Sequence, residues 1–331
     1  MVDKGETDAV VMSRYLLRRL VQVVPLLAGV ITLSFILIHA APGDPATYLA
    51  GDSASADYLK FVRHRFELDR PLPQQYLTYV VRLLHGDLGR SFTQGAPVAA
   101  LILERLNATL LLLSSATVVS TVLGIGMGII AARRPHSLID GAISLLTLSG
   151  SSMPVFWLGQ ILLLVFSLEL GWLPTQGMTD VRQSLTGLPH LLDILRHLIL
   201  PVTALTLQQF ALIVRLTRTG MIEVLERDWI TAARARGLSE RLVVLRHALP
   251  NALLPVTTLI GTQVGFWLSG AVLTETVFGW PGLGRLTLDA TLARDYPVLL
   301  GILIAVSVAV VLANLTTDLV YTLLDPRVRL G

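Results

Sequence analysis

The sequence predicts an all-α polytopic membrane protein in which six helices cross the bilayer. The chain has 331 residues, of which 53% are hydrophobic and only 15% charged, and its mean hydropathy is +0.66. These values are typical of integral membrane proteins. Six stretches are apolar over the ~20 residues that a helix needs to cross about 30 Å of hydrocarbon. Because lipid offers an irregular backbone no hydrogen bonds, each stretch is expected to be helical.

The predicted spans fill residues 20–324, between an N-terminal segment at 1–19 and a tail at 325–331. In order they are Leu20–Ala41, Leu110–Ala132, Ala142–Leu168, Leu198–Leu216, Leu253–Leu273 and Val298–Leu324. The prediction is least secure for the fourth, because two glutamines and Arg215 lie inside it or at its edge. The first also resembles a signal peptide, since arginines precede it, but no small-residue cleavage site follows.

Positively charged residues predict the orientation. With the N-terminus inside, the inner segments carry 15 Lys or Arg in 71 residues, and the outer segments carry 11 in 116. The positive-inside rule therefore places both termini in the cytoplasm. It leaves a long outer loop at 42–105 and an inner loop at 217–250. In the outer loop, apolar residues at helical spacing predict a short amphipathic helix packed on the outer face of the membrane: Tyr76, Leu77, Val80, Leu83 and Leu84.

The inner loop reads as two short helices joined by a turn. Asp228 is a plausible N-cap for a helix at Trp229–Arg236, and Gly237 suits the left-handed position that ends it. Ser239 is placed to cap a second helix.

The first helix of the inner loop has one face with little side-chain bulk, formed by Ala232, Ala233 and Ala235, with Arg234 and Arg236 beside it. Two interpretations follow from this pattern. The face is either a docking surface for another protein or part of an amphipathic helix on anionic lipid headgroups.

The run Thr231-Ala232-Ala233, with Gly237 and Leu249-Pro250 behind it, resembles the EAA loop of bacterial ABC-importer permeases. This chain has Thr231 in place of the usual Glu and His247 in place of an Ile. Both replacements are typical of one branch, the dipeptide, oligopeptide and nickel permeases. Since Thr231 has no carboxylate, no ionic contact of the family's Glu is carried over to it.

The resemblance to this branch extends along most of the chain, through eight peptides that each stand at the expected place relative to a span. They are APGDPA (41–46), LDRPLPQQY (68–76), GDLGRSF (86–92), PVFWLG (154–159), LGWLPTQG (170–177), TETVFGWPGLGRL (274–286), ARDYP (293–297) and LLDPRVR (323–329). The long loop after the first span is similar to that of the first of the two permease subunits in such importers.

The resemblance implies a type I ABC-importer permease fold (the MetI-like fold) in the bacterial inner membrane. It implies as partners a second permease, one or two ATPase subunits and an extracytoplasmic substrate-binding protein. Contact with the ATPase would fall on Asp228, Thr231, Ala232, Ala233, Arg234, Arg236, Gly237, Leu249 and Pro250. ATP and magnesium would bind to the partner, because neither of the two lysines, Lys4 and Lys60, stands in a P-loop.

The candidate translocation-path residues are polar side chains inside the spans: Ser151, Ser152, Gln208 and Gln263. Each has a structural alternative. The serines precede Pro154 and are suited to bond a carbonyl that a proline kink frees. The glutamines, with Gln209, are suited to hydrogen bonds between helices.

Other classes of function find less support. Asp318 in the sixth span would suit an ATP-independent secondary transporter or channel, and a membrane-embedded enzyme would need a catalytic constellation that the spans lack. The absence of cysteine and of a HExxH pattern gives no metal site, and a net charge of +3 gives no nucleic-acid partner. Related permeases serve peptides, glutathione, nickel chelates or oligosaccharides, and the sequence does not choose among these substrates.

Overall fold

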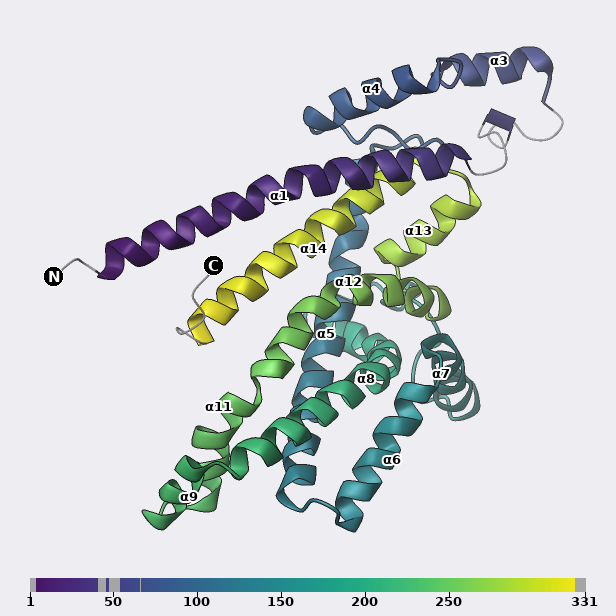
Figure 1. Ribbon diagram of the computed structural model, residues 1–331. Helices are drawn as coiled ribbons and strands as arrows, with labels where there is room; N and C mark the ends of the chain where they lie inside the picture. Colours follow the sequence, from purple (N-terminus) through teal and green to yellow (C-terminus); the bar gives the residue numbers. More distant parts are fainter. Residues whose placement is uncertain (1–3, 41–45, 48–53, 66, 325–331) are drawn as a thin grey trace. The chain divides into compact units, whose positions relative to one another are not determined.

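The structure is a computed structural model that describes the backbone of residues 4–40, 46–47, 54–65 and 67–324, and their side chains except at 4–20, 38, 262–270 and 317–324. The described residues form helices, turns and loops, with one isolated bridge between Arg90 and Pro97 (Figure 1). The chain divides into two compact units. One is formed by residues 1–106 with 286–331, and the other by residues 107–285.

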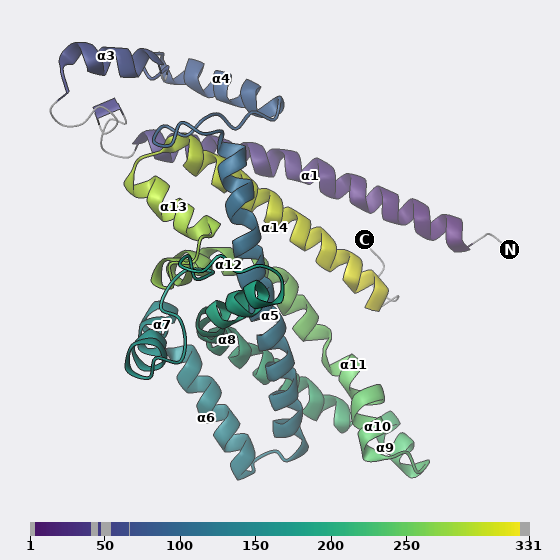
Figure 2. The same cartoon turned by 180° about the vertical axis from the view of Figure 1, so that it is seen from behind.

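The first unit contains the two ends of the chain. Helix α1 (Lys4–Ala40) lies beside α14 (Tyr296–Leu324) (Figure 2). Between them in sequence come α3 (Ala56–Arg65) and α4 (Leu72–Leu84), which confirms a helix at the place where the sequence predicts an amphipathic one. The Tyr76 hydroxyl oxygen of α4 is 2.6 Å from the Thr32 hydroxyl oxygen of α1.

A buried carboxylate ties the loop after α4 to the start of α14. Asp295 accepts hydrogen bonds from the Ser91 hydroxyl at 2.5 Å, the Phe92 backbone N–H at 3.1 Å and the Thr93 hydroxyl at 2.8 Å. The peptides GDLGRSF and ARDYP are therefore joined by these hydrogen bonds. A buried carboxylate needs such a set of donors to offset the loss of water.

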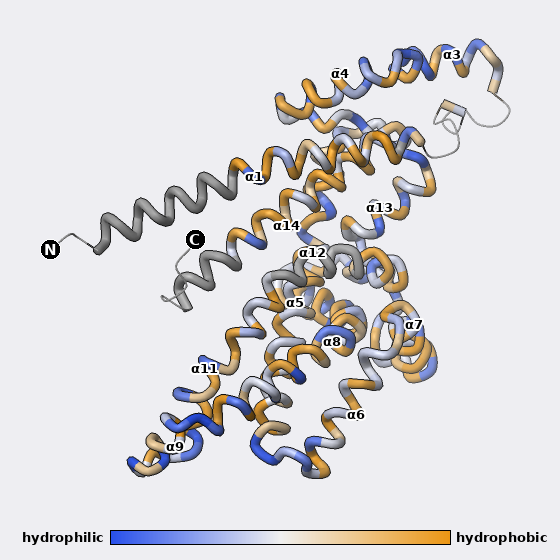
Figure 3. Tube along the Cα trace, in the orientation of Figure 1, coloured by the Kyte–Doolittle hydropathy of each residue, from blue (hydrophilic) through white to orange (hydrophobic). Residues whose placement is uncertain are grey.

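The second unit holds the remaining long helices: α5 (Val98–Arg133, from residue 107 on), α6 (Leu138–Ser152), α7 (Val155–Leu162) with its π-helical continuation (Leu163–Glu169), α8 (Leu188–Leu225) and α12 (Leu254–Val277). A buried cluster joins α5, α7, α8 and α12, and Leu112, Leu205 and Trp280 are fully buried members of it. Hydrophobic residues run along α5, α6, α7 and α8, whereas hydrophilic residues gather at α9 (Asp228–Ala235) (Figure 3).

The peptide TETVFGWPGLGRL folds the end of α12 onto α5 and onto the start of α13 (Leu283–Leu292). Glu275 is fully buried, and its carboxylate accepts hydrogen bonds from the Thr109 hydroxyl at 2.6 Å and the Arg285 N–H at 3.0 Å. The Trp280 indole donates to the Ala108 carbonyl at 2.8 Å. A Cβ at Gly282 would overlap the Glu275 carboxylate, so a glycine is required there.

Three of the predicted spans lie in helices that are long and apolar enough to cross a membrane alone: α5, α8 and α14. Two bent helix pairs raise the number to as many as five. In the first predicted span, the described apolar stretch is the shorter Val21–Leu37. The count of six therefore stays a prediction. The side chains of Gln263 and Asp318 lie outside the described residues.

The third predicted span is not one continuous helix, which corrects the sequence-based expectation. Helix α6 ends at Ser152 and α7 begins at Val155, and the two are bent by 102°. Between them Met153 is extended, with φ −93° and ψ 135°. A residue before proline disfavours the helical conformation, and Pro154 itself has no N–H to donate. The residues Met153 and Pro154 therefore account for the break. Its bend is larger than that of a proline kink within a continuous helix.

Candidate functional site

The inner loop folds as two helical segments around a turn. Helix α9 covers Asp228–Ala235, so Asp228 lies in its first turn and not at the predicted N-cap, which is Arg227. Gly237 has φ +79°, the predicted left-handed position. Ser239 precedes the second segment as predicted, but its side chain makes no capping hydrogen bond.

The second helical segment of the loop is continuous from Glu240 to Ala252, although its turns differ in winding. It comprises α10 (Glu240–Leu242), a π-helical stretch (Val243–Ala248) and α11 (Leu249–Ala252). Leu249 packs on the buried core of the loop, whereas Pro250 is exposed. A π-helical turn inside a helix is uncommon and frequently marks a functional site.

The loop has a hydrophobic core of its own, shared with the ends of α5 and α8. Its buried members are Ala132, Met221, Ile230, Ala233, Val243, Val244, Ala248 and Ala252. Helix α11 also approaches α8 closely, since a Cβ at Gly220 would come within 2.8 Å of the Ala252 carbonyl oxygen. The loop is therefore a folded element that packs onto the ends of α5 and α8.

The free face of α9 differs from the one that the sequence indicates. Ala233 is buried in the loop core, so it does not belong to an exposed small-residue face. Thr231, Ala232 and Arg236 are exposed, and so is Trp229, with 44% of its surface free. Sequence reasoning missed Trp229, although a tryptophan in a polar loop is the kind of side chain that anchors protein interfaces.

Arg234 is engaged within the loop. Its guanidinium donates to both carboxylate oxygens of Glu240, at 2.9 and 3.1 Å, so it holds the two helical segments together across Gly237. The hydrogen bond from Arg234 is the main cause that lowers the pKa of the Glu240 carboxyl below its ordinary value. Both side chains are more than one-third exposed, and water screens the pair to about 1 kcal/mol or less.

An ion pair near the loop joins α6, the first half of the broken span, to α8. Arg218 of α8 donates from Nε and Nη2 to the two carboxylate oxygens of Asp140 in α6, both at 2.7 Å. Asp140 is buried and also accepts from the His136 N–H at 2.9 Å. This two-point contact fixes both the spacing and the rotation of α6 against α8. Nothing in the local sequence pattern predicts it.

Glycines on α5 allow α8 to approach closely. A Cβ at Gly124 would fall 2.7 Å from Ile213, and one at Gly128 would fall 2.5 Å from Thr217, whereas Gly126 has open space around it. Two of these three glycines of α5 therefore pack against a helix of the same chain.

The candidate path residues separate into two groups. The hydroxyls of Ser151 and Ser152 donate to the Leu148 carbonyl at 3.2 and 2.7 Å. A proline at 154 frees the carbonyl four residues before it, at Gly150, so these two bonds do not support the expected role at the proline break. Both serines are exposed. Gln208 is exposed on α8, whereas the neighbouring Gln209 accepts from the Ser120 hydroxyl of α5 at 3.3 Å. Gly150 of α6 lies against the backbone of Leu207 in α8. Ser151 is the next residue after Gly150, and Gln208 is the next after Leu207, so both candidates adjoin this contact.

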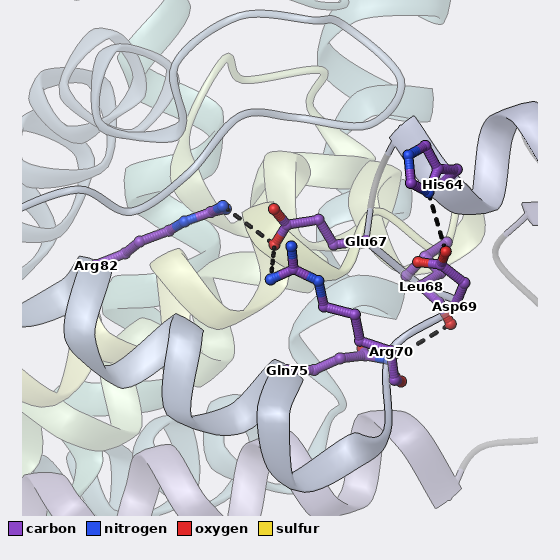
Figure 4. Close-up of polar contacts among 7 residues, drawn as sticks. All are labelled: His64, Glu67, Leu68, Asp69, Arg70, Gln75 and Arg82. Atoms are coloured by element: carbon purple, nitrogen blue, oxygen red, sulfur yellow. Dashed lines mark hydrogen bonds and ion pairs between the residues drawn. The ribbon is translucent and has the colours of Figure 1, made fainter.

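Polar contacts join α3, the turn that follows it and α4 (Figure 4), among His64, Glu67, Leu68, Asp69, Arg70, Gln75 and Arg82. The Glu67 carboxylate lies 3.2 Å from Arg82 and 3.5 Å from Arg70. The Gln75 amide donates to the Arg70 carbonyl at 2.7 Å. The peptide LDRPLPQQY thus supplies the structure of this turn. His64 bonds to Asp69, and His85 bonds to the Val81 carbonyl.

Comparison with known proteins places these features in a family. Residues 124–330 match the family described as binding-protein-dependent transport system inner membrane component, and residues 12–113 match the N-terminal component of such membrane proteins. The chain is 39% identical over 319 residues to the oligopeptide transport system permease protein AppB of Bacillus subtilis, covering 96% of this chain and 99% of that protein. The chain belongs to the binding-protein-dependent transport permeases.

Other relatives match nearly the whole of this permease. The dipeptide transport system permease protein DppB of Escherichia coli K12 is 40% identical over 336 residues, covering 96% of this chain and 99% of that protein. Among solved structures, the inward-facing MetNI methionine ABC transporter gives a TM-score of 0.54 at 17% identity, over 69% of this permease and 97% of that chain. The structural likeness supports the all-α, MetI-like fold.

Proposed function

We propose that this permease is one of two membrane subunits of an ATP-driven importer of di- and oligopeptides in a bacterial inner membrane. The names of its full-length relatives support the substrate class, because AppB, DppB and a Pseudomonas aeruginosa di/tripeptide permease all serve peptides. Peptide would arrive from an extracytoplasmic binding protein and cross between this chain and a second permease. Both termini would lie in the cytoplasm, as the distribution of positive charge favours.

The folded inner loop is the observation that carries the coupling part of the proposal. It is packed onto α5 and α8 by its own core, yet it leaves the Trp229, Ala232 and Arg236 face of α9 uncovered. A rigid helix with an exposed aromatic anchor and small neighbours is suited to enter a cleft on another protein. The partner would be an ATPase, which would bind ATP and Mg²⁺. The other proposed coupling residues are Asp228, Thr231, Gly237 and Pro250, with Ala233, Arg234 and Leu249 supporting them from inside the loop.

The contacts of the loop give it a route to the membrane helices. When the ATPase subunits close, α9 would move as a rigid body and take α8 with it through the Gly220–Ala252 contact. Helix α6 would follow α8 through Arg218 and Asp140. Spans three to five would then turn together between inward- and outward-facing states. Ser151, Ser152, Gln208 and Gln263 stay candidates for the path that such a motion opens.

The test is peptide uptake into proteoliposomes that hold this chain, the second permease and the ATPases, with the binding protein outside. Uptake is expected to require ATP and to cease with Gly237→Trp, whose bulk would obstruct docking. Gly237→Asn is the control, because asparagine tolerates the left-handed conformation without that bulk, and it should retain uptake.

Two results would contradict the proposal. Uptake that persists without the ATPases and follows an ion gradient would indicate a secondary transporter. Normal ATP-driven uptake by Gly237→Trp would show that the loop is not the coupling element. Glutathione should be included as a substrate, because the glutathione permease GsiC of E. coli is as similar as the peptide permeases, with 40% identity over 318 residues. A complex that carries glutathione and no other peptide would change the substrate and leave the mechanism intact.

A further inference from the structure

Helix α4, outside the predicted spans, presents an apolar face that nothing in the described structure covers. Leu77, Val81 and Leu84 stand at i, i+4 and i+7, so they share one side of the helix. They are 64%, 47% and 81% exposed. A contiguous exposed apolar stripe in a folded protein indicates a surface that meets something other than water.

The opposite side of α4 is polar and faces a cavity. Gln75, Thr78 and Arg82 line a space of about 610 Å³ together with residues of the 87–95 loop and the start of α14. Arg82 is held there by Glu67 (Figure 4). Helix α4 is therefore amphipathic, with its hydrophilic side toward this cavity and its apolar side away from it.

A contact with α1 shows how far along the spanning helices α4 lies, and therefore its depth in the membrane. The His39 ring of α1 lies 5.7 Å from the ring of Tyr296, the first residue of α14, a helix that is long and apolar enough to cross a membrane. Thr32 precedes His39 by seven helical residues, which is about 10 Å along the axis at 1.5 Å per residue. The Tyr76 hydroxyl reaches Thr32, and its ring meets the Phe35 ring edge-on at 5.3 Å. Part of α4 thus lies alongside the spanning helices and not beyond their ends.

We propose that α4 is an interfacial helix whose Leu77, Val81 and Leu84 face is immersed among lipid acyl chains, in the leaflet at the His39 end of α1. An amphipathic helix at an interface buries its apolar face about 5–10 Å deep, which agrees with the depth that Thr32 indicates. On α1 at the same level, Leu33, Ile36 and Leu37 are also more than half exposed. The apolar face of α4 therefore continues a surface of the same kind on a predicted span.

The depth argues for lipid as the occupant. A soluble binding protein could cover residues beyond the ends of the spans, but it would not reach a face about 10 Å inside the level at which α14 enters the membrane. In the orientation of the proposed function this is the extracytoplasmic leaflet, but the lipid contact itself does not depend on that orientation or on the substrate.

The absence of cysteine from the chain makes the test direct. Single-cysteine variants at Leu77, Val81 and Leu84 would carry a nitroxide label in the complete complex, in vesicles of phosphatidylethanolamine and phosphatidylglycerol. Collision rates with oxygen, which enters lipid, and with a water-soluble nickel chelate would be compared. Leu37→Cys provides the lipid reference, and Lys60→Cys on α3 and Thr78→Cys on the polar flank of α4 provide the water references.

The oxygen-to-nickel ratio at the three apolar positions is expected to match that at Leu37 and to exceed that at Lys60 severalfold. Ratios like that at Lys60 would overturn the proposal, because the face would then lie in water. Labels that are immobilised and shielded from both reagents would also overturn it, because another protein would then cover the face. As an independent measurement, Leu77→Trp should be quenched by acyl-chain-brominated lipid more strongly than Lys60→Trp, and equal quenching would contradict immersion.

Discussion

Ala232 and Ala233 are neighbours in sequence with opposite surroundings. Ala233 is buried in the core of the inner loop, whereas Ala232 is exposed on α9. The two positions therefore separate the stability of the loop from its use as a docking surface. The same chemical change at each position should give different results.

Ala232→Glu is expected to leave the loop folded and to abolish co-purification of the ATPase, because a charged side chain would occupy the contact face. Ala233→Glu should instead unfold the loop, since an uncompensated buried charge costs about 3–5 kcal/mol. Hydrogen exchange of the loop amides would distinguish the two variants. Rapid exchange in Ala232→Glu, or an intact ATPase complex with it, would refute this assignment of faces.

At this scale the sequence predicts backbone better than side-chain environment. The left-handed conformation at Gly237 follows from the turn between two helical patterns, because few other residues adopt it without strain. The burial of Ala233 depends on the core that Val243 and Met221 complete. That core assembles residues distant in sequence, so a local pattern of alanines does not reveal which one faces inward.

At the scale of elements, the packing of α5 against α8 depends on two glycines. A Cβ at Gly128 would lie 2.5 Å from Thr217, while Gly126, half a turn away, has nothing within 4 Å. Overpacking of a close contact typically costs about 1–3 kcal/mol. The third glycine of the run thus provides a control on the same helix.

Gly128→Ala is accordingly expected to lower the thermal stability of the purified complex, and Gly126→Ala to leave it unchanged or to raise it by up to about 1 kcal/mol through helix propensity. Thermal denaturation in detergent would measure both variants. Equal effects of the two substitutions would show that the close approach of α5 and α8 is absent in the complex.

The ion pair between α6 and α8 supports a prediction about coupling. Arg218→Gln should reduce the peptide imported per ATP hydrolysed and lower stability by about 1.5–3 kcal/mol, since charged hydrogen bonds are lost. Arg218→Lys should lie between, because lysine keeps the charge without the two-point contact. Arg215→Gln, at an exposed arginine one turn earlier on α8, is the control. An unchanged ratio in Arg218→Gln would show that α6 does not need this contact to follow α8.

Elements with strong local signals are the ones that the sequence predicts. Helices α5, α8 and α14 follow from long apolar stretches, and α4 follows from its helical spacing of apolar residues. The break in the third span is only half visible, because Pro154 predicts an interruption but not a bend of 102°. The Asp140–Arg218 contact joins residues 78 positions apart, and no local pattern signals a pairing of that range.

For the whole molecule, the clearest expectation concerns sidedness. In cells expressing single-cysteine variants, Lys60→Cys should react with a membrane-impermeant maleimide added outside. Arg236→Cys should react only after the membrane is opened. Both side chains are exposed in the structure, so burial does not account for a failure to react. The reverse pattern would place the termini outside and remove the basis for an ATPase at α9.

The length of α8 bears on what α9 can touch. The helix continues nine residues past Leu216, where its predicted span ends, to Leu225, which adds about 14 Å at 1.5 Å per residue. The headgroup layer on each side of the hydrocarbon is only about 5–8 Å thick. With α8 near the bilayer normal, the arginines around Gly237 therefore lie beyond the phospholipid headgroups. A partner protein that stays outside the membrane can reach them there.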